Sequence, residues 1–443
     1  MGSAFRPQHR VSPAAEKAAR FSAQHCTSWE DMTSLIPNGT QTLSKCPDRY
    51  VNGVYPKMLD RAEGSTVMDR EGNAYTDYIC ALGPILLGHR CESVNYFVRQ
   101  GMAEGQVLLS LPHRHEYTLA AMMKKDVAPW ADKFKFYKTG SDALTAAVKV
   151  ARAHTRREKV LVCGYHGWHD WTQARPSNTK KSGVPFALTS LIAEFKYNDL
   201  ESLRVQFQKG DIAAVIMEPA IYDEPKDNFL QEVMRLAREH AAVVVFDEVV
   251  TGFRFGLPGA AGYFGVEPDL ACYSKAMGNG FPIAALAGRE EFMRVFERND
   301  FFISGTFGGD LIGINAARGV IEYLRAYPQT IDKIWESGEC LRDGFNQIAQ
   351  GLGIEGVSCI GYPPRTMFLF PTTEHKALFW QECVKLGVLF GYANFITAQH
   401  HLATIQNTLG VCDTALRVVK EHWADPKAAL EGEPPVELWR GVR

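Results

Sequence analysis

A lysine and a carboxylate, each placed directly after a short apolar segment, are the residues whose types and spacing could do chemistry. Asp247 follows the valine-rich run 241–246, and Lys275 follows the apolar run 270–273 and one serine. Short apolar runs of this kind predict strands that are buried on both faces of a parallel sheet. Both side chains are therefore expected at the carboxyl ends of their strands, the edge at which open α/β sheets bind ligands.

An amine and a carboxylate at one sheet edge could serve a pyridoxal phosphate cofactor. The amine of Lys275 can form a Schiff base with the aldehyde of the cofactor, and Asp247 can keep the pyridine nitrogen protonated. The protonated ring then withdraws electrons from a substrate carbanion. For either residue alone, the simpler interpretation is an ordinary loop carboxylate or a solvated lysine. The surrounding motifs therefore decide whether the pair is interpreted as a cofactor site.

Three ordered motifs around these residues resemble the class-III (ω-type) pyridoxal-phosphate aminotransferases, and among them the glutamate-1-semialdehyde aminomutase branch. The motifs are F-D-E-V-V-T-G-F-R at 246–254, P-D-L at 268–270 and S-K-A-M-G-N-G-F-P at 274–282. The resemblance implies that Lys275 and Asp247 are the catalytic residues. Lys275 would be the Schiff-base lysine, and Asp247 would be the partner of the pyridine nitrogen.

A glycine turn before a helix is the candidate phosphate site. The segment 134–143, F-K-F-Y-K-T-G-S-D-A, predicts a strand, a turn and the start of an alanine- and valine-rich helix. A helix N-terminus presents free N–H groups and a positive dipole end to an anion. Gly140 and Ser141 are therefore expected to bind the phosphate, although a glycine before any helix gives the same pattern. The family more often has S-G-T-E-A at this place.

The other predicted cofactor contacts follow from the resemblance. The predicted strand 160–164 is followed by Y-H-G at 165–167. The resemblance implies that Tyr165 stacks on the cofactor ring and that His166 belongs to the same site. It also implies that Val249 is the apolar contact beneath the ring. Two spaced histidines on a loop do not predict a metal, and no metal site is expected.

Two polar residues on other segments complete the predicted cofactor site. Glu218 resembles the acid of the family's E-P turn near the hydroxyl edge of the cofactor, and a structural hydrogen bond is an equal alternative. Thr306, in G-T-F, would reach the phosphate of the neighbouring subunit's cofactor, which implies a homodimer with shared active sites. An ordinary helix-capping role is the alternative for Thr306.

Two basic residues are candidates for substrate binding. In the aminomutase branch, the segment corresponding to 36–45 runs past the substrate and carries an arginine near its end, where this chain has Lys45. Lysine is a point charge rather than a bidentate fork, which argues against glutamate semialdehyde as the substrate. Arg365 is the second candidate. A surface position is an equal alternative for Lys45 and the favoured one for Arg365.

The elements that must position these residues predict an α/β fold. Strands and helices alternate between residues 134 and 287, which favours a mainly parallel sheet flanked by helices. The resemblance implies a fold-type I PLP-dependent transferase with a seven-stranded sheet and a smaller α+β domain. The expected division is an N-terminal arm and part of the small domain at 1–85, a large PLP-binding domain at 86–325 and a C-terminal small domain at 326–443. A helical arm (with helix-favouring residues 14–21) and an exposed tail from residue 425 are also expected.

Composition is typical of a globular enzyme. The chain has 443 residues, of which 46% are hydrophobic and 22% charged, and a net charge of −2, which gives no reason to expect nucleic acid as a partner. No apolar run approaches the roughly 18 residues of a membrane span, so no membrane association is expected. Ten scattered cysteines without C-x-x-C pairs indicate reduced thiols, and a cytoplasmic location is predicted.

The predicted activity is a PLP-dependent aminotransferase that acts through a Lys275 Schiff base and a pyridoxamine phosphate intermediate. It would move an amino group from a donor to a small carbonyl acceptor, for example a biosynthetic aldehyde or ketone or an amino sugar. The alternative is an intramolecular aminomutase of the glutamate-1-semialdehyde 2,1-aminomutase type. A dinucleotide-dependent oxidoreductase would need a third glycine in step with G-x-G at 278–280. A catalytically silent relative is disfavoured by the presence of both Lys275 and Asp247.

Overall fold

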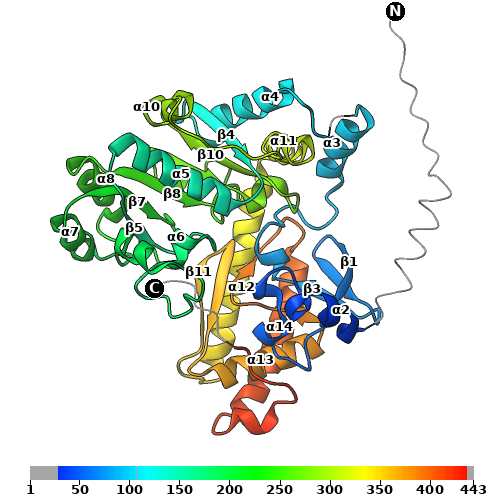
Figure 1. Cartoon of the computed structure of the whole chain (residues 1–443). Coiled ribbons are helices and arrows are strands. Elements are labelled where there is room, and N and C mark those ends of the chain that lie inside the picture. Colours follow the sequence, from blue (N-terminus) through cyan, green and yellow to red (C-terminus); the bar gives the residue numbers. More distant parts are fainter. Residues whose placement is uncertain (1–27, 106, 437–443) are drawn as a thin grey trace, which may run out of the picture.

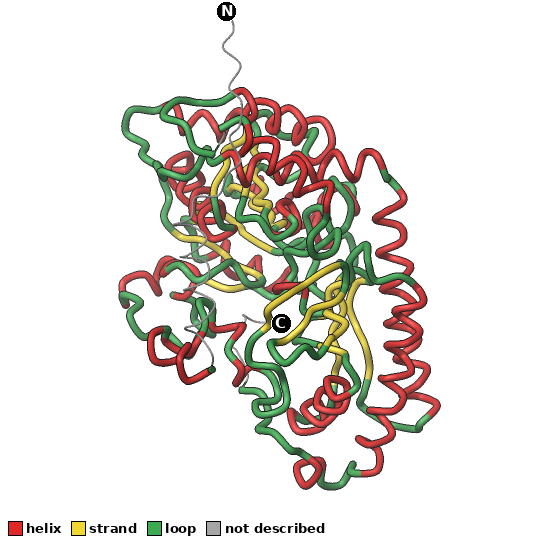
Figure 2. The backbone as a smooth tube through the Cα atoms, turned by 90° about the vertical axis from the view of Figure 1, so that its right-hand side faces the viewer, coloured by secondary structure: helices red, strands yellow, loops and turns green. Residues whose placement is uncertain are grey.

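The structure, a computed structural model, describes residues 28–105 and 107–436 (Figure 1). The helix-favouring segment predicted at 14–21 lies outside the described residues. The described chain has one large sheet with its helices, and a second part with two smaller sheets and three long helices. Figure 2 shows that helices surround the strands of both parts.

The large sheet has seven strands in the order β4-β10-β9-β8-β7-β5-β6. Strand β10 is antiparallel to both of its neighbours, β4 and β9, and the other pairs are parallel. This arrangement confirms the predicted mainly parallel seven-stranded sheet. The strands are β4 (Lys133–Tyr137), β5 (Lys159–Cys163), β6 (Ile192–Glu194), β7 (Ile212–Met217), β8 (Val243–Glu248), β9 (Leu270–Tyr273) and β10 (Ala284–Gly288).

The central strands are apolar on both faces because each face is covered. In β8, Val243 and Val245 pack with helix α5 (Gly140–Thr155) in one core cluster, whereas Val244 and Phe246 belong to a second cluster with helix α8 (Phe229–Glu239). Successive strand residues point to opposite faces, so a continuous apolar run fills two cores. The other helices of this part are α3 (Glu92–Ala103), α4 (Arg114–Met122), α6 (Asp170–Gln173), α7 (Leu200–Gln208), α9 (Gly259–Tyr263), α10 (Glu290–Met293) and α11 (Leu311–Ala326).

The second part of the structure combines both ends of the described chain. The four-stranded sheet joins β1 (Leu59–Glu63), β2 (Thr66–Asp69) and β3 (Ala74–Asp77) to β13 (Val388–Leu389), which pairs with β3 in parallel. A three-stranded sheet contains β11 (Ser358–Tyr362), β12 (Arg365–Leu369) and β14 (Asn394–Phe395). The helices are α2 (Trp29–Leu35), α12 (Gln329–Gly351), α13 (Thr373–Lys385) and α14 (Leu402–Glu421).

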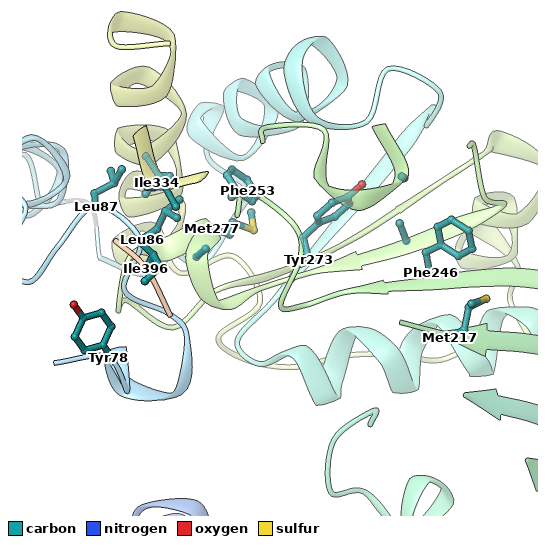
Figure 3. Close-up of a cluster of buried hydrophobic side chains, with 14 of the residues drawn as sticks. Tyr78, Leu86, Leu87, Met217, Phe246, Phe253, Tyr273, Met277, Ile334 and Ile396 are labelled. Carbon is teal, nitrogen blue, oxygen red and sulfur yellow. The ribbon is translucent and has the colours of Figure 1, made fainter. Parts of the chain in front are cut away.

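One continuous apolar core links the two parts. Figure 3 shows Met217 and Phe246 of the large sheet at one end of this cluster and Tyr78 and Ile396 at the other, with Phe253 between them. The residues between the sheet and the smaller part therefore share a packed interior. Such interiors resist small displacements, which keeps the site between them in a defined geometry.

The C-terminal tail, which was expected to be exposed, is exposed at Asp425, Lys427 and Ala428 but is also bonded to the N-terminal part of the chain. Asn52 and Glu433 form an isolated antiparallel bridge, and Arg49 donates a hydrogen bond of 2.8 Å to the carbonyl of Val436. Pro426 is buried. No helix among residues 28–105 and 107–436 combines the length and apolar character that crossing a membrane requires.

Candidate active site

Asp247 and Lys275 lie at the carboxyl ends of two adjacent parallel strands. Asp247 is the penultimate residue of β8 and pairs in register with Cys272 of β9, while Lys275 follows β9 by two residues. The apolar run predicted the strand at 241–246, but β8 continues through Asp247 and Glu248 because its ladder with β9 extends to Tyr273. Lys275 is close enough for its charge to lower the pKa of Asp247.

Lys275 has a backbone conformation that side-chain-bearing residues seldom adopt. Its φ angle is 46°, in the left-handed region. A non-glycine residue there costs on the order of 1–3 kcal/mol and is held in place by its surroundings. Ser274 contributes to these surroundings, since its hydroxyl donates a hydrogen bond of 2.8 Å to the carbonyl of Ile283.

Asp247 is buried and held from two sides. Its Oδ2 lies 2.8 Å from Nδ1 of His166, and its Oδ1 accepts a hydrogen bond of 3.0 Å from the N–H of Val249. Burial raises the pKa of Asp247 to about 7, against the lowering effects of the Val249 bond and the charges of Lys275 and Arg365. A buried carboxylate with such a raised pKa gains from a cationic partner.

His166 is a neutral imidazole that orients Asp247. The side chain is fully buried, and this burial lowers the pKa of His166 to about 3, with a further lowering from the charge of Arg175. The ring therefore carries no charge near neutral pH. A neutral ring can donate a hydrogen bond from Nδ1–H to Asp247 without neutralising the carboxylate, whose negative charge stays available to another group.

Glu248, the second carboxylate of the strand end, has a structural role. It accepts hydrogen bonds from the N–H groups of Ala260 (3.0 Å) and Ala261 (2.6 Å) and from the hydroxyl of Thr251. Adjacent strand residues point to opposite faces, so Glu248 faces away from the side that holds Asp247. Its bonds fasten the loop that follows β8.

The predicted phosphate site is the first turn of helix α5. Thr139 and Asp142 form a capping box in which each side chain accepts a hydrogen bond from the backbone N–H of the other. The first N–H groups of a helix have no partner within it, and the box uses only that of Asp142. The amides of Gly140 and Ser141 thus remain oriented as an anion site requires.

Glycine allows the close contacts around this helix end. A Cβ atom on Gly140 would lie 2.7 Å from a methyl group of Val249, and one on Gly167 would lie 2.2 Å from the hydroxyl of Ser141. Three segments therefore approach one another closely: the N-terminus of α5, the loop after Asp247 and the Y-H-G turn after β5. Three predicted cofactor contacts, Gly140, Ser141 and Val249, meet at this point.

Glu218 connects the Y-H-G turn to the C-terminal part of the chain. Its Oε1 accepts a hydrogen bond of 2.8 Å from the N–H of Tyr165, and its Oε2 lies 3.2 Å from Nη1 of Arg365. Tyr165 is 44% exposed, so part of it is accessible to a ligand. Arg365 is not a surface residue, contrary to the favoured interpretation, because its side chain is only 11% exposed and lies over the ring of Tyr222.

Two predicted site residues lie apart from this cluster. Lys45 is exposed in the short turn η2 (Leu43–Lys45), and Thr306 is exposed in the turn before α11. Among the described residues, the side-chain hydrogen bonds of Asp247 go to His166 and to the N–H of Val249.

Sequence reasoning missed two polar residues that support the site. Arg175 is buried, donates a hydrogen bond of 3.0 Å to the carbonyl of Thr172 and shifts the pKa values of His166 and Asp247. Asn279, four residues after Lys275, accepts hydrogen bonds from the N–H groups of Leu86 (2.9 Å) and Leu87 (2.8 Å). Asn279 lies in the motif S-K-A-M-G-N-G-F-P at 274–282, so the sequence could have identified it as a candidate site residue. Arg175 lies in no recognisable motif.

The residues present fit pyridoxal phosphate. A helix N-terminus with small residues suits its phosphate, a half-exposed tyrosine suits its ring, and a buried carboxylate with a raised pKa suits its protonated nitrogen. Lys275 supplies an amine at the same edge. Among the residues that the structure describes, no group of three or more histidine, cysteine or acidic side chains has the arrangement of a metal site.

Comparisons with known proteins agree with this assignment. Residues 50–395 match the family described as aminotransferase class-III. The 3-aminobutyryl-CoA aminotransferase of Cloacimonas acidaminovorans is 38% identical over 310 residues, which cover 68% of this chain and 73% of that protein. The glutamate-1-semialdehyde 2,1-aminomutase of Methanothrix thermoacetophila is 33% identical over 411 residues, 86% of this chain and 94% of that protein.

A solved structure supports the fold and the cofactor. The FumI protein of Sphingopyxis sp. MTA144, in its PLP internal aldimine form, has a TM-score of 0.83 and 27% identity over 92% of this chain and 97% of its own. An ω-transaminase from Sphaerobacter thermophilus shares the fold at 22% identity, with a TM-score of 0.80 over 88% of this chain and 97% of its own. With the family match over most of the chain, these findings establish a fold-type I enzyme that uses pyridoxal phosphate, and this chain belongs to the class-III aminotransferases.

Proposed function

We propose that this enzyme transfers an amino group between separate donor and acceptor molecules. The observation that carries the proposal is the buried Asp247, held by His166 and the Val249 amide, with the charge of Lys275 close by. When bound, pyridoxal phosphate supplies an aldehyde that accepts an amino group and a ring that withdraws electrons from the substrate carbon. The protein must hold that ring and move one proton.

Each part of this task has a candidate residue. Gly140 and Ser141 would bind the phosphate, and Tyr165 and Val249 would contact the two faces of the ring. Asp247 would hold the proton of the ring nitrogen in a position that His166 fixes. The amine of Lys275 would accept the proton from the substrate carbon and return it elsewhere, as a positioned general base does.

The chain's own cations argue against a second carboxylate on the acceptor. Arg365 is paired with Glu218 at 3.2 Å, and Lys45 stands at the place where the aminomutase branch has an arginine. A lysine point charge discriminates less well for a planar carboxylate than a bidentate arginine does. The relative named 3-aminobutyryl-CoA aminotransferase supports transfer between separate molecules, and the relatives named glutamate-1-semialdehyde 2,1-aminomutase support the intramolecular alternative.

A donor screen tests the proposal and separates it from the alternative. The holoenzyme is mixed with L-alanine, L-glutamate, 3-aminobutyrate or 1-phenylethylamine, and the loss of the visible absorbance of pyridoxal phosphate is followed. Addition of a keto acid or aldehyde should restore that absorbance and release an aminated product. An aminomutase would instead rearrange glutamate-1-semialdehyde without any second substrate. Inactivity with every amine would contradict the proposed transfer, and inactivity with glutamate-1-semialdehyde as well would contradict both functions.

We further propose that the enzyme is a homodimer and that it is located in the cytoplasm. Within each chain, we propose domain boundaries at residues 85/86 and 325/326. Free thiols at all nine described cysteines support a reducing compartment. Large apolar side chains are exposed on the segment 107–117 and on the turn around Thr306, and the N–H of Leu311 joins these segments by a bond to Val107. An exposed apolar surface of this kind supports subunit association. The side chains are Leu108, Leu109, Leu111, Tyr117, Phe302 and Phe307.

Thr306→Ala should weaken cofactor binding in the dimer. If the hydroxyl bonds the phosphate of the partner subunit's cofactor, its loss removes a hydrogen bond to a charged group, worth roughly 1.5–3 kcal/mol, or about ten- to a hundredfold in affinity. Cofactor titration of the apoenzyme measures the change. Thr189→Ala, which removes an exposed hydroxyl elsewhere, is the matched control.

Mixed dimers show from which subunit Thr306 acts. Subunits with Lys275→Ala are combined with subunits that carry Thr306→Ala. One site then has both defects, whereas the other has Lys275 from one subunit and Thr306 from its partner. Tight cofactor binding and activity should return at that second site. Heterodimers that show no recovery would place the threonine in its own subunit's site or outside any site.

A further inference from the structure

Arg254 is a fully buried arginine whose partners are all backbone carbonyls. Its Nη1 donates to Ile396 O (2.7 Å) and Pro364 O (3.4 Å), and its Nη2 donates to Gly83 O (2.8 Å) and Ile85 O (3.0 Å). The side chain is 0% exposed, and no carboxylate within residues 28–105 and 107–436 pairs with it. Burial lowers the pKa of Arg254 to about 10, so the guanidinium is still charged at neutral pH.

Burial of a charged side chain without a counter-ion has a large desolvation cost. An apolar side chain of similar volume at such a position is often neutral or stabilising, so stability alone does not explain the arginine. Its planar fork can bond several carbonyls at once in fixed directions. Here those carbonyls belong to three segments far apart in the sequence, at 83–85, 364 and 396.

All three segments lie outside the seven-stranded sheet, and Arg254 reaches them from the loop that follows Asp247. The loop is itself fastened to β8, since the N–H of Gly252 donates to the carbonyl of Glu248 at 2.8 Å. Figure 3 shows Phe253, the neighbour of Arg254, in the same buried cluster as Leu86 and Ile396. The guanidinium also lies 5.0 Å from the ring centre of Phe395.

Each bonded segment leads directly to a site residue. Pro364 precedes Arg365, whose guanidinium binds Glu218 and through it the backbone of Tyr165. Phe395, next to Ile396, pairs in register with Arg365 across β12 and β14. The segment beyond Ile85 is bonded by Asn279, which follows Lys275 by four residues.

We propose that Arg254 is a positioning residue of the active site. By bonding Pro364 and Ile396 it fixes where Arg365 meets Glu218, and by bonding Gly83 and Ile85 it fixes the segment beside the turn of Lys275. The predicted cofactor contacts Gly140, Ser141 and Tyr165 lie on the large sheet and its helices, so Arg254 sets the substrate side of the site. This inference rests on the proposed amino-group transfer.

The test compares Arg254→Lys with Arg157→Lys in the holoenzyme. Lysine keeps the charge but cannot bond three segments in the directions of the fork. Arg157 is a half-buried arginine that also donates only to backbone carbonyls in the hydrogen bonds described, those of Ile212, His240 and Ala241, at the opposite ends of the strands. It therefore reports the cost of losing such bonds away from the site.

Arg254→Lys should lower kcat/KM for the best donor of the amine screen by on the order of ten- to a hundredfold, mainly through KM, since a small misplacement has effects of this size. Its affinity for pyridoxal phosphate should stay within about twofold of the wild-type value, because the proposed phosphate contacts Gly140 and Ser141 lie on α5, which Arg254 does not bond. Arg157→Lys should leave both quantities unchanged. Equal kinetics for the two lysine variants would overturn the proposal.

A second readout does not depend on activity. Amide hydrogen exchange in Arg254→Lys should accelerate in peptides that cover 83–87 and 393–397 and not in those that cover 140–150. An increase spread evenly over the protein would contradict the inference. If Arg254→Lys does not fold, Phe395→Leu replaces it, since it removes the ring beneath the guanidinium but no donor, and the same pattern at smaller amplitude is expected.

A wild-type enzyme that reacts with no amine would refute the proposed function and not this inference. In that case the hydrogen-exchange pattern alone tests the positioning role of Arg254, because that measurement requires only the folded holoenzyme. Conversely, an active wild-type enzyme with evenly distributed exchange and unchanged kinetics in Arg254→Lys refutes the inference and leaves the proposed function standing.

Discussion

Lys275→Ala is expected to abolish turnover while the protein still folds and binds pyridoxal phosphate. The substitution removes both the amine that bonds the cofactor and the base that moves the proton, so the loss should exceed about 10⁴-fold. The proposed phosphate and ring contacts come from α5, Tyr165 and Val249, which the substitution leaves in place. Stopped-flow absorbance with the best donor measures the rate.

Borohydride reduction of the wild-type holoenzyme, followed by peptide mapping, checks the assignment directly. The label should appear on Lys275, and a label on another lysine would refute it. Lys385→Ala is the matched control, since that lysine forms exposed ion pairs with Glu382 and Glu431. Exposed pairs contribute little to stability, and this variant should retain wild-type activity.

Asp247→Asn is expected to slow the half-reaction with an amino donor at least ~100-fold, the size typical of losing one preorganised electrostatic contact. Asparagine keeps the volume and can still accept the bond from the Val249 amide, but it carries no charge to hold a proton on the ring nitrogen. Stopped-flow absorbance at saturating cofactor measures the rate. A rate near that of the wild type would mean that Asp247 is not the partner of the ring nitrogen.

The same substitution should change how the stability of the cofactor-free protein depends on pH. The pKa of Asp247 is raised to about 7 in the folded state, so the folded state binds more protons than the unfolded state between about pH 4 and 7, and this group's contribution falls as pH rises. The pKa of His166 is lowered to about 3, so its contribution rises with pH up to about 6.5. The two slopes oppose each other in the wild-type protein.

Removal of the Asp247 carboxyl group removes its falling contribution and leaves the rising contribution of His166 in place. The free energy of unfolding of Asp247→Asn should therefore rise more steeply between pH 4 and 6 than that of the wild-type apoenzyme. Urea unfolding at several pH values measures the slopes. Identical slopes in the two proteins would show that the Asp247 carboxyl does not titrate in this range.

The local sequence pattern was sufficient to predict the bounds of strands that are buried on both faces. The apolar runs at 212–217 and 270–273 coincide with β7 and β9, because strands in the middle of a covered sheet need apolar residues at every position. The pattern failed at β8, where Asp247 and Glu248 looked like the residues after the strand. Polar residues can continue a strand when its neighbour still offers ladder bonds, and β9 does so up to Tyr273.

The roles of charged residues depended on partners that the sequence does not reveal. Asp247 and Glu248 are adjacent and chemically alike, yet one faces His166 and the other binds the amides of Ala260 and Ala261. Arg365 had the appearance of a surface residue, and the fold buries it against Glu218, which is 147 positions away. A pattern in one segment carries no information about which distant segment will meet it.

The sequence by itself determined the family, the cofactor, the mainly parallel sheet and the placement of Lys275 and Asp247 at one edge. These features depend on ordered motifs and on burial patterns within single segments, which local physics links to strands, helix starts and turns. The tertiary structure alone decided the strained φ of Lys275, the pairing of Asp247 with His166, and the convergence of three segments on Arg254. Such features arise because packing brings together residues that are far apart in the chain, and buried polar groups must find partners wherever the fold places them.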